Sequence, residues 1–184
     1  MTAEALARSP LEERASDLET IGARLLPFLT QVDLRVDPVN ADRSPYALPL
    51  EPNTSVEHEG VATLWLGPDE WLLVGPRGSA EDISSALGTA FASVHHSIVD
   101  VSANRVAIEL IDEDRVETLS HVCSLDLEPP AWIAGRCAQS LVGRAHVLLE
   151  ERADATRLFV RPSFAGYVVE LVLAVRKVRG DVRA

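Results

Sequence analysis

Two apolar runs of strand length flank a short turn in the stretch LWLGPDEWLLVGP, residues 64–76. The turn spans Gly67 to Glu70, and Pro68 suits position i+1 of a type I turn, so the stretch predicts a β-hairpin. It carries two of the chain's three tryptophans, Trp65 and Trp71, which cross-strand geometry can place on one face of the sheet. Each indole can bury on the order of 200 Å², so we expect both in the core, with contact to a partner protein as the alternative.

The chain before the hairpin predicts one helix, one strand and a long loop. Ser9 can cap a helix over RSPLEERASDLETIGARLL, with Pro10 at the first helical position and Glu12 completing a capping box. Apolar and polar residues then alternate over 31–36, which is the period of a half-buried strand. Prolines recur over 37–60 and disfavour long regular elements, so we expect a surface loop with one helical turn.

The chain after the hairpin predicts three helices separated by strands. Each helix begins at a residue that can cap it, namely Ser79, Asp112 or Ser163. Apolar runs of strand type lie between these helices, at residues 97–102, 105–110, 137–149 and 157–160.

Both halves of the chain therefore follow the order strand, helix, strand, strand, helix. This order predicts an α+β fold of two interlocked ferredoxin-like βαββαβ units with antiparallel sheets. We expect residues 1–30 to form a partly helical N-terminal segment and residues 31–184 to form one domain. Within that domain, two pseudo-repeats are expected at about 31–96 and 97–178.

The charge balance and the cysteine count limit the classes of partner and the compartment. The chain has 17 Lys and Arg against 28 Asp and Glu, a formal net charge of −11, whereas nucleic acid is bound by clustered cations. We therefore expect no nucleic-acid partner. The apolar windows are too short for a membrane span and residues 1–9 lack the layout of a secretory signal. We expect a cytoplasmic protein with no membrane partner, in which Cys123 and Cys137 are thiols.

One group of side chains has the residue types of a nucleophilic site. Ser97 and Ser102 lie close in sequence to His95 and His96, and a serine nucleophile needs such a base beside it. No nucleophile elbow surrounds either serine, so we expect the histidines to be solvated or at the edge of the core.

A second group has the residue types of a zinc site. His121, Cys123 and Cys137 supply imidazole and thiolate, the donors that zinc prefers. The paired cysteine spacing of zinc sites is missing, and no phosphate-binding glycine loop is present. We expect Cys123 and Cys137 to be small core residues, and no catalytic, cofactor-binding or metal-binding residue in this chain.

The C-terminal stretch VRKVRGDVRA reverses the overall charge. Its cations, which favour the dipole at the end of a helix, are Arg176, Lys177, Arg179 and Arg183. A patch that pairs with an acidic partner surface is the alternative interpretation.

Six segments together resemble the gamma subunit of heterotetrameric sarcosine oxidase, over about Leu48 to Val175. They are LPLEPN, LWLGPDEWLLVGP, VDVSANRVAIEL, CSLDLEP, GRCAQSLVGRAHVLL and RLFVRPSFAGYVVELV. The most specific combination is LGPDEWLL followed by CSLDL and GRCAQ. This family is similar in fold to the folate-binding region of the glycine-cleavage aminomethyltransferase, which agrees with the duplicated order of elements.

The resemblance implies a non-catalytic subunit that docks directly on the alpha chain of an assembly with alpha, beta, gamma and delta chains. It implies that FAD, FMN, NAD and tetrahydrofolate lie on the alpha and beta chains and zinc on delta, with no cofactor bound by this chain. The reaction of such a complex is oxidative demethylation of sarcosine to glycine, with the one-carbon unit passed to tetrahydrofolate.

This sequence departs from the aminomethyltransferase pattern in the hairpin at 141–150. Those enzymes carry a Gly-Gly turn followed by a catalytic aspartate, whereas this chain has the single Gly143 and Leu148-Leu149 in the acidic region. Glu150 is the only carboxylate within this hairpin stretch, so independent folate chemistry is not expected. The alternatives are a stand-alone aminomethyltransferase-like folate binder, or a gamma-like subunit of a related N-methyl amine oxidase.

Trp132 lies in the Pro-rich segment LEPPAWIAG, which predicts an exposed loop. Exposed aromatic residues flanked by polar ones are typical interface anchors. We therefore predict Trp132, with Trp65 and Trp71, as residues that could contact the alpha chain.

Overall fold

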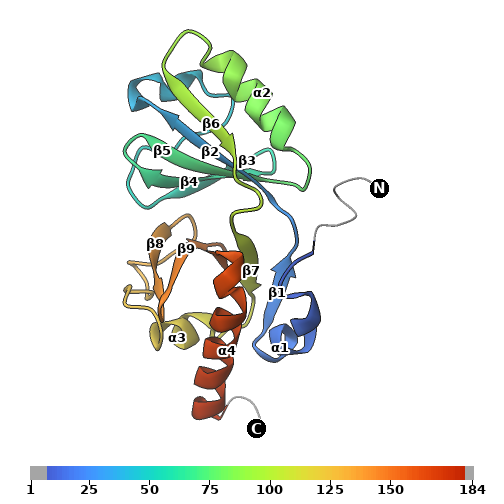
Figure 1. The fold of residues 1–184 in the computed structure, drawn as a ribbon. Coiled ribbons are helices and arrows are strands. Elements are labelled where there is room, and N and C mark those ends of the chain that lie inside the picture. Colours follow the sequence, from blue (N-terminus) through green and yellow to red (C-terminus); the bar gives the residue numbers. More distant parts are fainter. Residues whose placement is uncertain (1–7, 181–184) are drawn as a thin grey trace.

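The computed structural model describes residues 8–180. Their strands form two five-stranded antiparallel sheets, which lie one above the other in Figure 1 and are called here the upper sheet and the lower sheet. The upper sheet, in the order β3-β4-β5-β2-β6, contains β2 (Thr30–Val36), β3 (Ser55–His58), β4 (Val61–Gly67), β5 (Glu70–Gly75) and β6 (His96–Asp100). The lower sheet, in the order β1-β7-β10-β9-β8, contains β1 (Ala23–Leu26), β7 (Val106–Leu110), β8 (Cys137–Val142), β9 (Ala145–Glu151) and β10 (Thr156–Val160).

Helices cover the outer face of each sheet (Figure 1). The helices of the described residues are the 3-10 helices η2 (Glu12–Arg14) and η3 (Pro38–Arg43) and the α-helices α1 (Ala15–Thr20), α2 (Ala80–Ala90), α3 (Arg115–Ser120) and α4 (Pro162–Arg179). Helix α2 packs on the upper sheet through Ile83 and Leu87, and α4 packs on the lower sheet through Val168 and Val172. A third cluster, which includes Leu72 and Phe159, fills the space between the sheets. The layers are therefore helix, sheet, sheet and helices.

The two sheets repeat one arrangement. In the upper sheet, β2 is followed by β3, β4 and β5, and β6 pairs on the free side of β2. In the lower sheet, β7 is followed by β8, β9 and β10, and the strand on the free side of β7 is β1, from the N-terminal part of the chain. The chain therefore passes between the sheets from β1 to β2 and again from β6 to β7, which interlocks the two units (Figure 1). The predicted α+β fold is confirmed, whereas the boundaries of the pseudo-repeats stay a prediction.

The N-terminal helix is shorter than predicted. It ends at Thr20, and ARLL forms β1, in which Arg24 pairs with Glu109 of β7. The unpaired edge of β7 supplies backbone partners for this segment, and that tertiary pairing overrides the local helical pattern. The predicted capping box is present in part, because Glu12 Oε1 accepts a hydrogen bond from the Ser9 backbone N–H at 2.8 Å.

The other predicted elements are confirmed with corrections at their ends, except that the run at 137–149 is two strands, β8 and β9, paired as a hairpin. The loop over 37–60 contains η3, as expected, but also β3, which pairs with β4. The Ser79 hydroxyl donates to the Pro76 carbonyl at 2.8 Å instead of capping α2. The residues at the N-cap positions of α3 and α4 are Asp114 and Arg161, where Asp112 and Ser163 were predicted.

Candidate functional site

The two hairpin tryptophans lie directly opposite each other on β4 and β5 and share one face of the upper sheet. Trp71 is 0% exposed, and its Nε1 donates a hydrogen bond to the Pro49 carbonyl at 2.8 Å. Trp65 is partly buried against the same core cluster. The expected core role is therefore confirmed for Trp71, and only Trp65 of this pair keeps exposed surface.

Trp132 is not the exposed residue that its Pro-rich segment predicts. It is 6% exposed, and its Nε1 donates a hydrogen bond to Glu151 Oε2 at 2.8 Å. The same oxygen accepts from Thr156 Oγ1 at 2.5 Å, and Arg115 Nη2 donates to Glu151 Oε1 at 2.9 Å. The physical reason is that Glu151 is itself buried and its oxygens need donors, and the indole is one of the three side chains that provide them.

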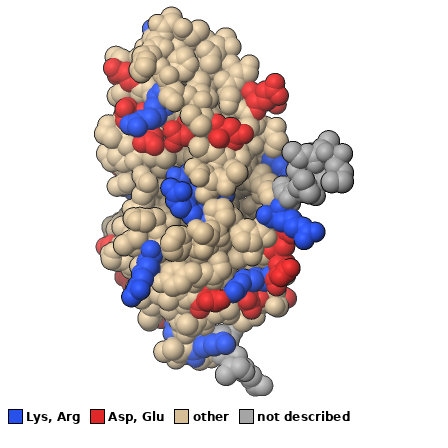
Figure 2. Space-filling view, in the orientation of Figure 1, with Lys and Arg blue, Asp and Glu red and all other residues tan. Residues whose placement is uncertain are grey.

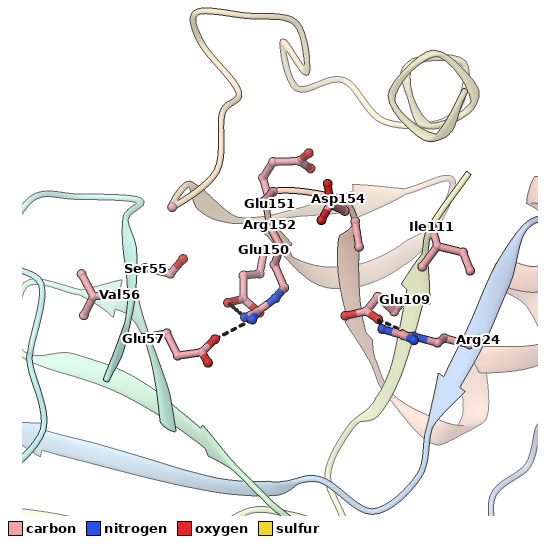
Figure 3. A pocket seen from close by; sticks show the side chains of 13 residues that line it. Arg24, Ser55, Val56, Glu57, Glu109, Ile111, Glu150, Glu151, Arg152 and Asp154 are labelled. Carbon is pink, nitrogen blue, oxygen red and sulfur yellow. Dashed lines mark hydrogen bonds and ion pairs between the residues drawn. The ribbon is translucent and has the colours of Figure 1, made fainter. Parts of the chain in front are cut away.

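A hollow of about 520 Å³ lies where strand β3, the turn after β9 and the strands β1 and β7 meet (Figure 3). We call it the acidic hollow. Its lining includes Arg24, Glu57, Glu109, Glu150, Glu151, Arg152 and Asp154. It contains Glu150, the carboxylate of the hairpin that differs from the aminomethyltransferase pattern. It also contains residues of both sheets whose proximity was not predicted from the sequence.

Charges of alternating sign cross the lower sheet at this hollow. The register places Arg24 opposite Glu109, Glu109 opposite Arg157, and Arg157 opposite Glu150. Arg24 Nε donates to Glu109 Oε2 at 2.6 Å, and Arg157 bonds Glu109 Oε1 at 3.1 Å and Glu150 Oε2 at 3.2 Å. We call these four residues the paired row, because each charge faces an opposite one, which favours cross-strand pairing.

Glu150 is committed to this ionic network. Arg152 Nη1 donates to Glu150 Oε1 at 3.1 Å, and Arg152 Nη2 reaches Glu57 of the upper sheet at 2.5 Å (Figure 3). Burial raises the pKa of the Glu150 carboxyl, and the neighbouring Arg157 and Arg152 oppose that rise. Both carboxylate oxygens already accept hydrogen bonds from arginines, so the arrangement is suited to joining the two sheets.

The serines and histidines considered for catalysis are engaged elsewhere. Ser102 Oγ donates to Asp100 Oδ1 at 2.5 Å, and His96 Nδ1 lies 2.9 Å from the Val94 carbonyl. His95 and Ser97 are exposed. Within residues 8–180 no hydrogen bond joins one of these serines to a histidine.

The cysteines are buried thiols. Cys137 Sγ lies 3.2 Å from the Thr54 carbonyl oxygen, and burial raises its pKa to about 12. Cys123 Sγ lies 3.7 Å from Ser140 Oγ. In the described part of the chain, no three His, Cys, Asp or Glu residues are arranged to hold a metal ion, so His121 does not join the cysteines in such a group. No helix among residues 8–180 is long and apolar enough to span a bilayer.

Gly143 has a packing role at the turn between β8 and β9. Its φ is +58°, a left-handed conformation that favours glycine. A Cβ at this position would lie 2.6 Å from Leu171 Cδ2 and would collide with the Tyr167 hydroxyl. The Arg144 N–H donates to that hydroxyl at 3.2 Å. The glycine thus allows the turn to sit on α4.

Two arginines of the basic C-terminal stretch pair within the chain. Arg176 is buried and its Nη2 lies 3.2 Å from Asp112 Oδ1, while Arg179 Nη2 lies 3.0 Å from Glu117 Oε2. Arg176 holds the pKa of the Asp112 carboxyl below its usual range. Arg183 lies outside the described residues. These contacts fasten α4 to the segment that carries α3.

The charged residues of the lower sheet were not predicted to form a site, although the sequence carries one signal of them. Glu109 and Arg157 each lie within a short apolar run that predicts a buried strand. A charge in such a run is rarely left unpaired, so each residue indicated a partner on a neighbouring strand. The identity of that partner depends on the strand register, which the sequence does not show.

Comparisons with known proteins agree over most of the chain. The model of the sarcosine oxidase gamma subunit family matches residues 36–175. A sarcosine oxidase subunit gamma from Arthrobacter sp. is 33% identical over 157 residues, covering 78% of this chain and 76% of that protein.

Two solved structures are similar in fold. A chain of the heterotetrameric sarcosine oxidase from Corynebacterium sp. U-96, in complex with pyrrole 2-carboxylate, superposes with a TM-score of 0.85 at 26% identity, covering 97% of this chain and 99% of that chain. The glycine cleavage system aminomethyltransferase T from Bartonella henselae has a TM-score of 0.64 at 12% identity, covering 86% of this chain and 48% of that one. The second likeness shows the fold alone.

Proposed function

Since the chain belongs to the sarcosine oxidase gamma subunit family, we propose that it is the gamma subunit of a heterotetrameric sarcosine oxidase and docks directly on the alpha subunit. The observation that carries this proposal is the likeness to one chain of a solved heterotetramer along almost the whole length of both chains. Beta and delta subunits complete the assembly.

The chain contributes surface and support, and the chemistry belongs to its partners. In this proposal FAD, FMN, NAD and tetrahydrofolate are held by alpha and beta, and zinc by delta. The complex oxidatively demethylates sarcosine to glycine and passes the one-carbon unit to tetrahydrofolate. A cytoplasmic location is supported by Cys123 and Cys137, which are both free thiols.

The residues of this chain do not fit a folate site of its own. Glu150, the carboxylate nearest to the aminomethyltransferase position, accepts hydrogen bonds from Arg152 and Arg157. Of the three tryptophans, Trp65 is the one that we retain as a contact to alpha, because Trp71 and Trp132 are almost fully buried within the chain.

Purification of the tagged chain from its native cells tests the proposal. We expect three further subunits to co-elute, with flavin absorbance and sarcosine-dependent formation of hydrogen peroxide in the same fraction. Recovery of a lone protein that binds tetrahydrofolate tightly would favour the stand-alone folate binder. Co-elution of a flavoprotein that oxidises another N-methyl amine, and not sarcosine, would favour a gamma-like subunit of a related oxidase.

A further inference from the structure

A row of basic side chains, two arginines and a histidine, crosses the lower sheet at the end away from the paired row. Val160 of β10 lies opposite both Val106 of β7 and Val147 of β9. Extending this register by one residue places Arg161 between Arg105 and His146. We call these three residues the basic row.

The basic row borders a second hollow of about 530 Å³. Its lining combines Arg105, Arg161 and His146 with Ser124, Gln139 and Leu141. Leu141 is 43% exposed, and Arg161 and His146 are exposed as well. This hollow is therefore open to solvent and offers basic side chains, polar groups and the exposed apolar side chain of Leu141.

The described residues place no carboxylate in ion-pair contact with the two arginines of the basic row. Within residues 8–180, neither the Arg105 nor the Arg161 guanidinium forms an ion pair or a hydrogen bond. Asp33 and Glu70 of the upper sheet attract Arg105 from a distance. Burial and the charge of Arg161 nevertheless lower the pKa of Arg105. Like charges on directly opposite residues destabilise a sheet, so the arrangement has a cost that the paired row avoids.

The charge and the exposure of the basic row are suited to binding an anion from outside the chain. The chain carries a formal net charge of −11, yet two arginines and a histidine gather here, and no acidic residue within 8–180 is in ion-pair contact with them. Figure 2 shows Lys and Arg atoms across the waist of one face, with most Asp and Glu atoms above and below them. Guanidinium groups bind carboxylates in a bidentate manner, and arginine beside exposed apolar surface is typical of interface centres.

We propose that the basic row receives carboxylate side chains of the subunit on which this chain docks. This inference rests on the proposed function, because it assigns a partner to a surface of the same subunit. Docking would place an opposite charge against Arg105 and Arg161 and remove the repulsion between them. Leu141 would add apolar contact at the border of the hollow.

Charge reversal tests the inference. Arg161→Glu, at an exposed position beyond the end of β10, is compared with Arg43→Glu, an exposed arginine whose Nη1 bonds Ser93 Oγ at 3.0 Å beside α2 on the upper sheet. The affinity of each variant for the gamma-free complex is measured at several salt concentrations. We expect Arg161→Glu to weaken binding about 30-fold or more and to reduce its salt dependence, whereas Arg43→Glu changes neither.

A zero-length cross-link identifies the source of the carboxylate. In the assembled complex carrying Arg161→Lys, a carbodiimide should join the new amine to an Asp or Glu of a partner subunit, as found by mass spectrometry of the digested product. A cross-link only to Asp33 or Glu70, or unchanged affinity of Arg161→Glu, would overturn the inference. It would also be overturned if succinate or inorganic phosphate saturated the isolated chain through Arg161 while assembly did not depend on that residue. If the wild-type chain does not assemble at all, the proposed function fails instead.

Discussion

The indole nitrogen of Trp132 and the carboxylate of Glu151 lie 2.8 Å apart, and their hydrogen bond ties the Pro-rich segment to the end of β9. Glu151 also holds Arg115, the first residue of α3. One buried carboxylate thus joins the segment before β8, the hairpin strand β9 and the start of a helix. Trp132, which the sequence predicts as a contact to a partner subunit, thus lies in the interior of this chain.

Changes at Trp132 should therefore lower stability first. Trp132→Ala empties a buried indole site and should cost about 3–5 kcal/mol of unfolding free energy. Trp132→Phe keeps most of the ring but removes the donor, and should cost about 1 kcal/mol for the lost hydrogen bond. Urea unfolding of the isolated chain measures both. Wild-type stability together with lost binding to alpha would restore Trp132 as an interface anchor.

The paired row should be much more sensitive to substitution than an exposed ion pair. Arg157→Met leaves Glu109 and Glu150 buried with fewer donors, and should cost about 3–5 kcal/mol. The control is Arg35→Met, because Arg35 pairs with Asp69 at 3.1 Å where both side chains are exposed. Denaturant unfolding should show little change for this control. Equal losses in the two variants would mean that the paired row does not stabilise the lower sheet.

Substitutions at two glycines should distinguish the stability cost of backbone strain from the cost of a steric clash. Gly60 has a φ of +78° with nothing within 4 Å of a built Cβ, whereas Gly143 combines a φ of +58° with close contacts to Tyr167 and Leu171. Gly60→Ala should cost about 1–2 kcal/mol, the penalty of a left-handed non-glycine residue. Gly143→Ala should cost more, because the turn must also move away from α4. Thermal unfolding compares the two, and an equal loss would contradict the packing role of Gly143.

Asp33 should make stability depend on pH. Burial and the nearby Glu70 raise the pKa of its carboxyl from 3.8 to about 6 in the folded chain. The fold therefore favours the protonated form, and this contribution is complete below the unfolded pKa and lost as the pH rises through about 6. Asp33→Asn mimics the protonated form, so its melting temperature should exceed that of the wild type more at pH 8 than at pH 5. Parallel pH profiles for the two proteins would contradict this expectation.

The sequence predicts the elements whose pattern is local. The hairpin of β4 and β5 has a turn proline between two apolar runs, and α2 has an apolar stripe at helical spacing. Strands β1 and β3 were not predicted because no local pattern marks them. Each is four residues long, and each is a strand because of the neighbour with which it pairs, β7 or β4.

The charged sites were beyond prediction because they depend on register. Arg105 and Arg161 are far apart in the sequence, and they become neighbours only when β7 and β10 pair with Val106 opposite Val160. A shift of one residue would turn each side chain to the other face of the sheet. Trp132 was placed wrongly for a related reason, since its burial depends on Glu151, which a Pro-rich local sequence does not reveal.

The interlocked arrangement of the sheets also sets an order of events at the ribosome. All strands of the upper sheet come from residues 30–100, so this sheet can be complete while the rest of the chain is still being synthesised. Strand β1 is made earlier, yet it has no partner until Val106–Leu110 has emerged. Strand β1, the first to leave the ribosome, therefore stays unpaired while the upper sheet can already form. It pairs with β7 only later, at the edge of the lower sheet.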